Sequence, residues 1–423
     1  MIKRSFFTLT RPKLSYDSVE QNPKKPESIN IPSNLTLLLN EPLDNTKKLL
    51  IQKGDSVEKG QKICLYSDSA EYVIAPVAGT IRVIDAYIDA LGNTSTFLVI
   101  KNIQTQTSDT KAKTYDLKED IASADRYLRN LPGAPPFKKL ADNKTKINTI
   151  VITCADADLL STTSQYIALN SMDKIKTGAR ILKNIIGAVK ICITVPQDLN
   201  IQGEFDSIQV FRTDTTYPSN LPAMILKNHL NMILPAGKTP EDLGVCFICA
   251  EAAASIADAY ETKSAGAEKI VTIIGKQGTR YRVKATIGTP LRKIFDLFSI
   301  HINDQDRIII GGPMQGISTY SPFHPVEPGM DTVIVQDRDE IPEICDNACV
   351  NCGKCVRICP ANIQANILVR YLAADQYEEA ADKCDLESCI ECGLCAYVCT
   401  AKIPIYQYIK LGKHELKKLR AEA

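Results

Sequence analysis

The chain has 423 residues, and its 50 Lys and Arg nearly balance its 49 Asp and Glu, for a formal net charge of +1. This length predicts about three domains at roughly 150 residues each. The near-neutral charge gives no basic field that would favour nucleic acid as a partner. The start "MIKRSFFTLT" lacks the apolar core of a secretory signal, and no apolar run reaches the roughly 18 residues that cross a bilayer. We therefore expect a reducing compartment, in which 15 cysteines are more often metal ligands than disulfides.

The first hundred residues predict an extended arm and then a small β domain. Residues 1–34 are polar and contain prolines, and we expect them to lie as an arm on other domains. Residues 35–103 contain short β-rich runs broken by turn residues, "KLLIQKGDSVEKGQKICLY" and "AEYVIAPVAGTIRVI". The polar stretch "KNIQTQTSDTKAKTYDLKED" that follows is typical of a linker.

The rest of the chain predicts an α/β domain, a β-grasp-like unit and a cysteine-rich unit. In residues 119–265 the apolar runs "INTIVITC", "AVKICITV" and "LGVCFIC" alternate with helical patterns such as "SMDKIKTGARILKNIIGA", which indicates a parallel sheet. Residues 266–330 predict two strands, a glycine-containing turn and one helix, closed by the turn "IIIGGPMQG". Residues 331–423 contain the cysteine-rich unit. The fold class is therefore multidomain, α/β plus β.

Two cysteine runs in the last unit share the spacing C-x2-C-x2-C-x3-C, which is typical of two-cluster bacterial ferredoxins. In that pattern three cysteines of a run hold one 4Fe-4S cluster and the fourth crosses to the other cluster. Gly353 and Gly393 lie inside the loops, where the backbone must curl around inorganic sulfur. The predicted ligand sets are Cys349, Cys352, Cys355 and Cys399 for one cluster, and Cys389, Cys392, Cys395 and Cys359 for the second.

Zinc sites or disulfides are the alternative for these runs, but zinc would require the usual two-pair spacing. Four more cysteines are better explained as buried thiols than as ligands or redox-sensitive groups. They are Cys345 and Cys384, just upstream of the runs, and the isolated C-x2-C pair Cys246 and Cys249.

The sequence also suggests how the surroundings act on the clusters. Acidic residues near the runs predict low cluster potentials. They are Asp346, Glu387 and Glu391. The basic end "IKLGKHELKKLRAEA" predicts a solvated helix end, with contact to anionic lipid or an acidic partner as the alternative.

The order of the modules, the turn "GGPMQG" and the runs "CVNCGKCVRICP" and "CIECGLCAYVC" resemble the C subunit of the Rnf electron-transport complex. The resemblance covers nearly the whole chain beyond the arm. It implies a lipoyl-like barrel-sandwich hybrid domain, an α/β domain similar to the complex I flavoprotein, an SLBB-like β-grasp unit and a two-cluster ferredoxin domain.

This family resemblance also implies a function. We expect a peripheral subunit on the cytoplasmic face of the cell membrane, in an ion-pumping complex that exchanges electrons between ferredoxin and NAD. FMN would lie in the α/β domain. The implied partners are integral membrane subunits, other iron-sulfur or flavin subunits, and ferredoxin or another electron carrier, with no nucleic acid.

Several positions depart from the pattern that the resemblance implies. Ser69 stands where a carrier domain has its acylated lysine. The flavin loop is "RNLPGAPPFKKL", which keeps Gly133 and Ala134 but introduces prolines that cannot donate an N–H to phosphate. These prolines are Pro132, Pro135 and Pro136.

Two further flavin motifs are altered. The acidic motif appears as "TCADADLLS", with Asp156 and Asp158 in place of the expected glutamates. The Gly-Glu-Lys turn has become "YPSNLPAMI", which offers no charge to a cofactor. Three losses in one pocket favour a site that no longer binds FMN or NADH tightly.

Two functional hypotheses follow. The favoured one is an electron relay and docking subunit in which only two 4Fe-4S clusters carry electrons, so the chain has no catalytic residues of its own for NADH. The alternative is an FMN-containing subunit that reacts with NADH. A purely structural scaffold is disfavoured because all eight cysteines are present. The sequence leaves open the direction of electron flow, the external donor, the coupled ion and the potentials.

Overall fold

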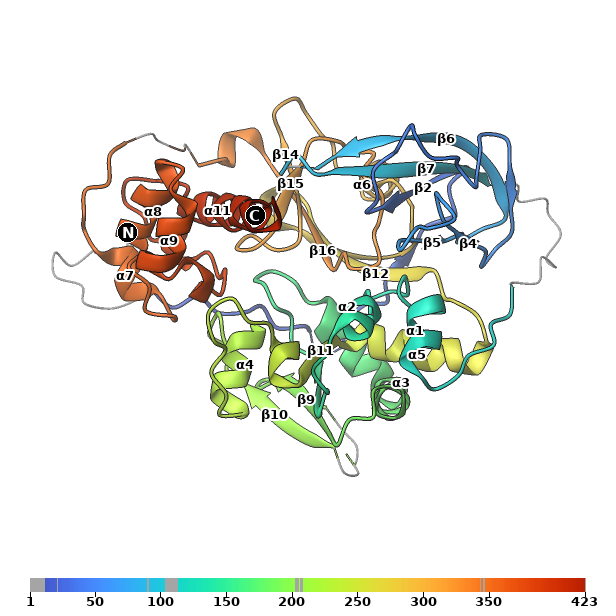
Figure 1. Ribbon diagram of the computed structural model, residues 1–423, viewed down its shortest axis with the longest axis horizontal. Coiled ribbons are helices and arrows are strands. Elements are labelled where there is room, and N and C mark those ends of the chain that lie inside the picture. The colour runs from blue at the N-terminus through green and yellow to red at the C-terminus, as the bar shows by residue number, and fades with distance from the viewer. Residues whose placement is uncertain are drawn as a thin grey trace.

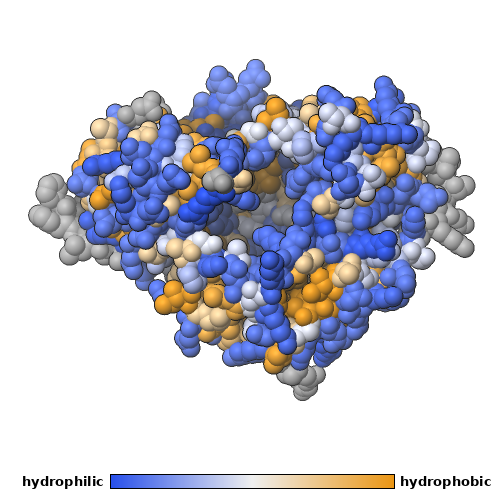
Figure 2. Space-filling view, in the orientation of Figure 1, coloured by the Kyte–Doolittle hydropathy of each residue, from blue (hydrophilic) through white to orange (hydrophobic). Residues whose placement is uncertain are grey.

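The computed structural model of the chain describes residues 12–20, 22–89, 91–102, 113–201, 205, 208–342, 344 and 347–422. Figure 1 shows three lobes: a β-rich lobe, an α/β lobe and a helical lobe that carries the C-terminal helix. The face in Figure 2 is mostly hydrophilic and is hollowed between the lobes. Much of the predicted linker, residues 103–112, lies outside the described residues.

The first part of the β-rich lobe is an antiparallel sheet in the order β2-β7-β6-β3, accompanied by the short ladder β4-β5. Alternate side chains of β2 point into one core, where Leu35, Leu37 and Leu39 pack with Leu98 and Ile100 of β7. This period of two arises because successive side chains of a strand face opposite sides. The strands are β2 (Asn34–Leu39), β3 (Ser56–Val57), β4 (Lys62–Ile63), β5 (Val73–Ile74), β6 (Gly79–Ile88) and β7 (Thr94–Asn102).

Ser69 lies in the connection between β4 and β5, where its hydroxyl makes local contacts. The hydroxyl donates to the Glu41 carboxylate at 2.7 Å and accepts the N–H of Tyr66 at 2.9 Å. A hydroxyl held this way offers no amine for acylation, so the connection serves packing within the unit.

The α/β lobe contains a four-stranded parallel sheet in the order β10-β9-β8-β11. Its central strands are buried apolar runs, as parallel strands covered on both faces require. Helices α3 and α5 pack so closely that a Cβ at Gly178 would lie 1.8 Å from the Ala253 carbonyl oxygen. The elements are α1 (Ile121–Tyr127), α2 (Phe137–Asp142), β8 (Thr149–Thr153), α3 (Thr163–Ile186), β9 (Lys190–Pro196), β10 (Gln209–Thr213), α4 (Pro222–His229), β11 (Val245–Cys249) and α5 (Ala250–Thr262).

A six-stranded mixed sheet in the order β1-β13-β12-β16-β14-β15 forms the next unit. Residues 27–28 of the N-terminal arm contribute β1, which pairs with β13 in parallel. The strand β16 lies beyond the predicted boundary at 330/331, and it pairs with both β12 and β14 inside this sheet. The elements are β1 (Glu27–Ser28), β12 (Glu268–Ile274), β13 (Arg280–Thr286), α6 (Leu291–Leu297), β14 (Arg307–Ile310), β15 (Ile317–Thr319) and β16 (Thr332–Gln336).

A buried ionic group joins this sheet to the α/β lobe. The ammonium of Lys269, on β12, is fully buried and pairs with the carboxylate of Glu251 on α5 and, at 3.1 Å, with that of Asp331. The other oxygen of Glu251 accepts the N–H of Ile270 at 3.0 Å. Since a buried charge is costly without partners, these contacts hold the two units in one arrangement.

The helical lobe is built from five helices, and α11 packs on α8 and α9. Gly412 of α11 allows close approach, because a Cβ there would lie 2.4 Å from the Leu372 side chain of α8. The apolar core contains Leu368, Leu372 and Ile409. The helices are α7 (Lys354–Ile358), α8 (Ala365–Ala373), α9 (Tyr377–Cys384), α10 (Leu394–Tyr397) and α11 (Ile405–Glu422).

Candidate metal centre

The two cysteine runs fold into loops with matching backbone conformations. In each run the residue before the second cysteine and the glycine after it both have positive φ, and a short helix, α7 or α10, follows. A third positive φ follows three residues after each fourth cysteine. The matched pairs are Asn351 and Glu391, Gly353 and Gly393, and Asn362 and Lys402.

The cysteines line two cavities, and each cavity takes three cysteines from one run and one from the other. The two cavities are similar in size, about 360 Å³ and 390 Å³ including space open to solvent. Four thiols around each cavity match the donor set of a 4Fe-4S cube. The first cavity is lined by Cys349, Cys352, Cys355 and Cys399, and the second by Cys389, Cys392, Cys395 and Cys359.

Within the described residues, no three His, Cys, Asp or Glu side chains are arranged to hold a single metal ion. The sulfur ligands of a four-iron cube stand further apart than those of one ion, because each binds a different iron.

The second run is covered by the turn "GGPMQG" at residues 311–316. A Cβ at Gly393 would lie 2.7 Å from the Met314 carbonyl oxygen, so only glycine fits beneath the turn. The side-chain amide of Gln315 donates to the Glu391 carbonyl at 3.0 Å. The hydroxyl of Tyr406, on α11, donates to the Gln315 carbonyl at 3.3 Å. The turn is thus a contact between the six-stranded sheet and the second cysteine loop.

Asp158 anchors this turn from the α/β lobe. Its carboxylate accepts the N–H of Met314 at 3.2 Å and that of Gln315 at 2.7 Å. Gly312 is needed at the contact, because a Cβ there would lie 2.2 Å from the Asp158 carboxyl carbon. Burial raises the pKa of Asp158, against the opposing effect of the N–H donors from Gln315, Leu159 and Met314.

The segment "YPSNLPAMI" also packs against the second run. The hydroxyl of Tyr217 donates to the Cys392 carbonyl at 2.7 Å, and its ring lies 5.5 Å from that of Tyr16 in the N-terminal arm. The side-chain amide of Asn220 donates to the Asp156 carbonyl at 3.0 Å. The arm and the α/β lobe together cover this side of the second run.

Comparison with known proteins agrees with this arrangement. Residues 17–105 match the RnfC barrel sandwich hybrid domain, and residues 348–403 match the 4Fe-4S dicluster domain. The chain is 25% identical over 386 residues to the C subunit of the Na(+)-translocating ferredoxin:NAD(+) oxidoreductase complex of Acetobacterium woodii, covering 86% of this chain and 84% of that protein. Over most of its length the chain is similar to the C subunits of Rnf-type complexes.

Other matches differ in coverage and strength. The chain is 28% identical over 423 residues to the C subunit of the ion-translocating oxidoreductase complex of Edwardsiella ictaluri, covering 93% of this chain but 52% of that protein. It thus spans about half the length of that relative. A crystal structure of NAD+-reducing [NiFe]-hydrogenase in the H2-reduced state aligns with 69% of this chain and 62% of that chain, at 14% identity and a TM-score of 0.40. That likeness is too low to support a functional comparison. Among the described residues, no helix is both long and apolar enough to cross a membrane.

The loop where the family resemblance implies FMN uses its amides internally. The N–H of Gly133 donates to the Pro328 carbonyl at 2.8 Å, and that of Ala134 donates to the Leu131 carbonyl at 2.9 Å. The φ of Gly133 is +87°, and a Cβ there would lie 2.4 Å from the Ala252 nitrogen at the start of α5. The prolines of this loop carry no N–H. The loop therefore does not fit a flavin phosphate.

Asp156 is also engaged inside the protein. Its buried carboxylate accepts the Ser161 hydroxyl at 2.8 Å and the N–H of Ser164 at 2.9 Å, and burial raises its pKa. The three altered flavin motifs thus make structural contacts in this chain.

The acidic neighbours of the second run are paired with cations, which the sequence reasoning missed. The ammonium of Lys413 lies 2.8 Å from the Glu391 carboxylate and donates to the Cys389 carbonyl at 2.7 Å. The guanidinium of Arg420 contacts Glu387 at 2.8 Å. These cations offset part of the charge of Glu387 and Glu391, and the low potential stays a prediction. Asp346 lies outside the described residues.

The thiols of the two runs differ in their surroundings. Burial raises the pKa of Cys389 and raises that of Cys392 to about 12. The pKa of Cys352 is lowered, chiefly by the N–H of Lys354 and then by the Thr400 hydroxyl. Because iron binds thiolates, metal must displace a more tightly held proton at Cys389 and Cys392 than at Cys352.

None of the other cysteines that the structure describes lines either cavity. Cys384 is buried in the core of the helical lobe, and Cys246 is buried in the α/β core. Cys249 precedes α5, and its sulfur accepts the N–H of Ala252 at 3.5 Å. Cys345 lies outside the described residues.

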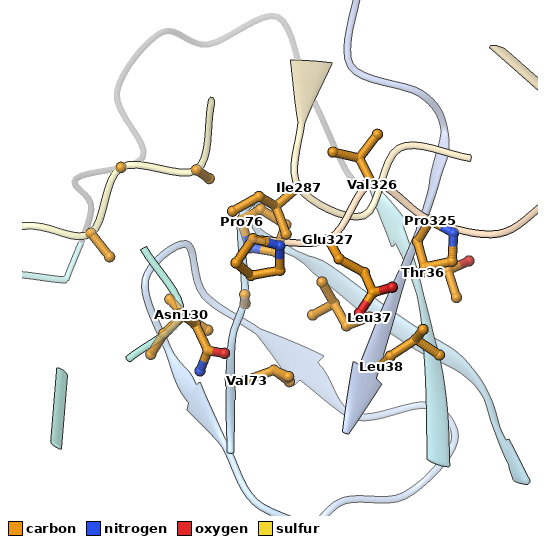
Figure 3. A pocket seen from close by; sticks show the side chains of 16 residues that line it. Thr36, Leu37, Leu38, Val73, Pro76, Asn130, Ile287, Pro325, Val326 and Glu327 are labelled. Carbon is orange, nitrogen blue, oxygen red and sulfur yellow. The ribbon is translucent and has the colours of Figure 1, made fainter. Parts of the chain in front are cut away.

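A separate pocket lies where the β-rich lobe meets the α/β lobe. Figure 3 shows Leu37, Leu38 and Val73 together with Pro76, Ile287 and Val326 around it. Its one carboxylate, that of Glu327, is bound to the His324 ring at 2.8 Å. This mostly apolar lining is a junction between units, and it shares no residue with the cysteine cavities.

Proposed function

We propose that this chain is the peripheral iron-sulfur subunit of an Rnf-type ion-translocating oxidoreductase, and that it relays electrons through two 4Fe-4S clusters. The observation that carries the proposal is the convergence of eight cysteines, as two sets of three plus one, around two cavities. Its relatives are C subunits of such complexes, which supports the assignment.

The proposed ligand sets are Cys349, Cys352, Cys355 and Cys399 for the first cluster, and Cys389, Cys392, Cys395 and Cys359 for the second. Each cluster, when bound, would accept and release one electron. The chain shapes the sites by directing N–H groups at sulfur: that of Ile363 lies 3.4 Å from the Cys359 sulfur, and that of Glu391 lies 3.4 Å from the Cys389 sulfur. Such hydrogen bonds raise the potential of a cluster by stabilising its reduced, more negative form.

The proposal extends to partners, location and finer fold. The partners are integral membrane subunits and other redox subunits of one complex, with ferredoxin or another carrier as the external partner. The chain would lie on the cytoplasmic face of the membrane as a peripheral subunit. We assign the α/β unit to a complex I flavoprotein-like fold, and the six-stranded sheet to an SLBB-like β-grasp unit that ends after β16.

Iron analysis tests the proposed clusters directly. Anaerobically prepared protein should contain about eight iron atoms, since each cube has four. Cys352→Ser should damage one cluster and leave the electron paramagnetic resonance signal of the other. Cys64→Ser, in the β-rich lobe, is the control and should keep both. Four or fewer iron atoms in reconstituted protein would contradict the two-cluster assignment.

We further propose that the chain does not react with NADH on its own, because its flavin motifs are committed to internal contacts. The amides of Gly133 and Ala134 are occupied, and Asp158 holds the "GGPMQG" turn. Purified protein should show neither stoichiometric flavin absorbance nor a micromolar site for NADH. Bound FMN in stoichiometric amount, or cluster reduction by NADH alone, would restore the alternative of an NADH-reactive subunit.

A further inference from the structure

The two cysteine runs differ sharply in exposure. The second run lies beneath the "GGPMQG" turn, the arm and Tyr217, and Cys392 is only 7% exposed. In the first run Cys352 is exposed and the neighbouring Val350 is 67% exposed. In the view of Figure 1, α7 of this run lies at the outer edge of the helical lobe. The first cavity is therefore the one that a second protein can approach.

Three cations lie in the first run or close to Cys399, the fourth cysteine of its cavity. Lys354 begins α7, and Lys402 follows three residues after Cys399. The guanidinium of Arg357 donates to the Cys352 carbonyl at 3.2 Å. All three side chains belong to exposed residues, and within the described part of the chain none pairs with a carboxylate. We refer to Lys354, Arg357 and Lys402 as the basic rim.

The second run has the opposite electrostatic arrangement. Its nearby carboxylate, that of Glu391, is paired with Lys413, so its charges are matched inside the protein. The basic rim has no such match among described residues. Exposed cations in the same short segment as an exposed apolar residue suit the polar rim of a protein interface. The carboxylates that pair with the basic rim would then belong to a partner protein.

We propose that the basic rim and Val350 form the docking site of an acidic redox protein that exchanges electrons with the first cluster. This inference rests on the proposed function, since it requires a cluster between Cys349, Cys352, Cys355 and Cys399. In one transfer the partner's reduced centre is oxidised by one electron and the cluster is reduced by that electron. No bond forms or breaks, and no proton is needed.

The charge arrangement favours this partner over a lipid surface. A redox partner must bring its own centre close to the cysteine cavity, and the rim residues lie immediately beside the cysteine loop in the sequence and the structure. An anionic membrane would attract the same cations without any need for a neighbouring cluster. The experiment below therefore includes both.

The test uses the full chain with both clusters and, as a probe, an acidic two-cluster bacterial ferredoxin. Binding is measured at several ionic strengths by calorimetry. Affinity should fall as salt rises, and the rim variant Lys354→Glu/Arg357→Glu/Lys402→Glu should bind at least tenfold more weakly, since three exposed charge pairs are reversed. The matched control reverses three exposed lysines elsewhere: Lys53→Glu/Lys144→Glu/Lys293→Glu.

Iron content and the electron paramagnetic resonance signals of each variant report whether both clusters are present. Failure of the docking proposal can therefore be told apart from failure of the proposed function. Loss of iron in the unmodified chain would refute the proposed function itself. With both clusters intact, equal binding by the rim variant and the parent would overturn the docking proposal, as would equal weakening in the control. Rim-dependent binding to vesicles of anionic phosphatidylglycerol without binding to the ferredoxin would also overturn it. Weaker, salt-dependent binding in the rim variant alone supports it.

Discussion

Replacing Asp158 by alanine should loosen the turn that covers the second cysteine run. The carboxylate accepts two backbone N–H groups of the turn, from Met314 at 3.2 Å and from Gln315 at 2.7 Å. A hydrogen bond to a charged acceptor contributes about 1.5–3 kcal/mol. Both donors belong to partly exposed residues, so we take the lower value, about 3 kcal/mol for the pair. Hydrogen exchange in residues 311–316 should accelerate by about a hundredfold.

Hydrogen exchange followed by mass spectrometry checks this expectation on peptides that span the turn. Asp158→Asn keeps one carbonyl oxygen but loses the charge, so its acceleration should be intermediate. Asp89→Ala is the control, because Asp89 likewise accepts local N–H groups, those of Leu91 and Asn93, but in the distant β6–β7 hairpin. An acceleration of less than threefold in Asp158→Ala would refute the anchoring role. An equal acceleration of hydrogen exchange in residues 311–316 of the Asp89→Ala control would also refute it.

Three further outcomes test the fold around the site. Gly133→Ala should lower the melting temperature more than Gly187→Ala. Both glycines have positive φ, but only Gly133 lacks space for a Cβ. Equal decreases in melting temperature would contradict the packing argument. Lys269→Met should destabilise by about 3–5 kcal/mol in chemical denaturation by leaving Glu251 unpaired, and adding Glu251→Gln should recover part of this loss. Burial raises the pKa of Asp156 above its value in the unfolded chain. The contribution of this group to the free energy of unfolding is therefore present at low pH and falls as pH rises from about 4. Asp156→Asn should flatten that slope in unfolding measured from pH 4 to 6, and an unchanged slope would refute the reasoning.

The sequence predicted the elements whose residues follow one regular local pattern, either a continuous apolar run or a repeated cysteine spacing. The apolar runs that became β8, β9 and β11 are buried on both faces, and such runs are typical of parallel strands. The two cysteine runs predicted paired loops because their spacing repeats, and the loops share the same positive-φ positions. Local spacing was sufficient in both cases.

Elements that depend on distant partners escaped prediction. β10 has the mixed sequence "QVFRT" and lies at the edge of its sheet, so it shows neither a continuous nor an alternating apolar pattern. β16 was placed with the cysteine-rich unit because nothing local reveals that it pairs with β12 and β14. The pairing of Lys413 with Glu391 joins α11 to the second cysteine loop, which precedes α10 in the sequence. Such contacts are set by tertiary packing.

The altered flavin motifs acquire a common physical meaning once their contacts are known. The loop at Gly133 is packed against α5, Asp158 holds the turn over Gly393, and Tyr217 binds the Cys392 carbonyl. The Tyr217 contact ends on the second cysteine run and the Asp158 contact on the turn that covers it, from segments far apart in the sequence. A lobe that held a flavin would need the amides of the Gly133 loop free for phosphate. On the proposed function, we expect the α/β lobe to support the second run and the exposed first run to be the side at which electrons enter or leave.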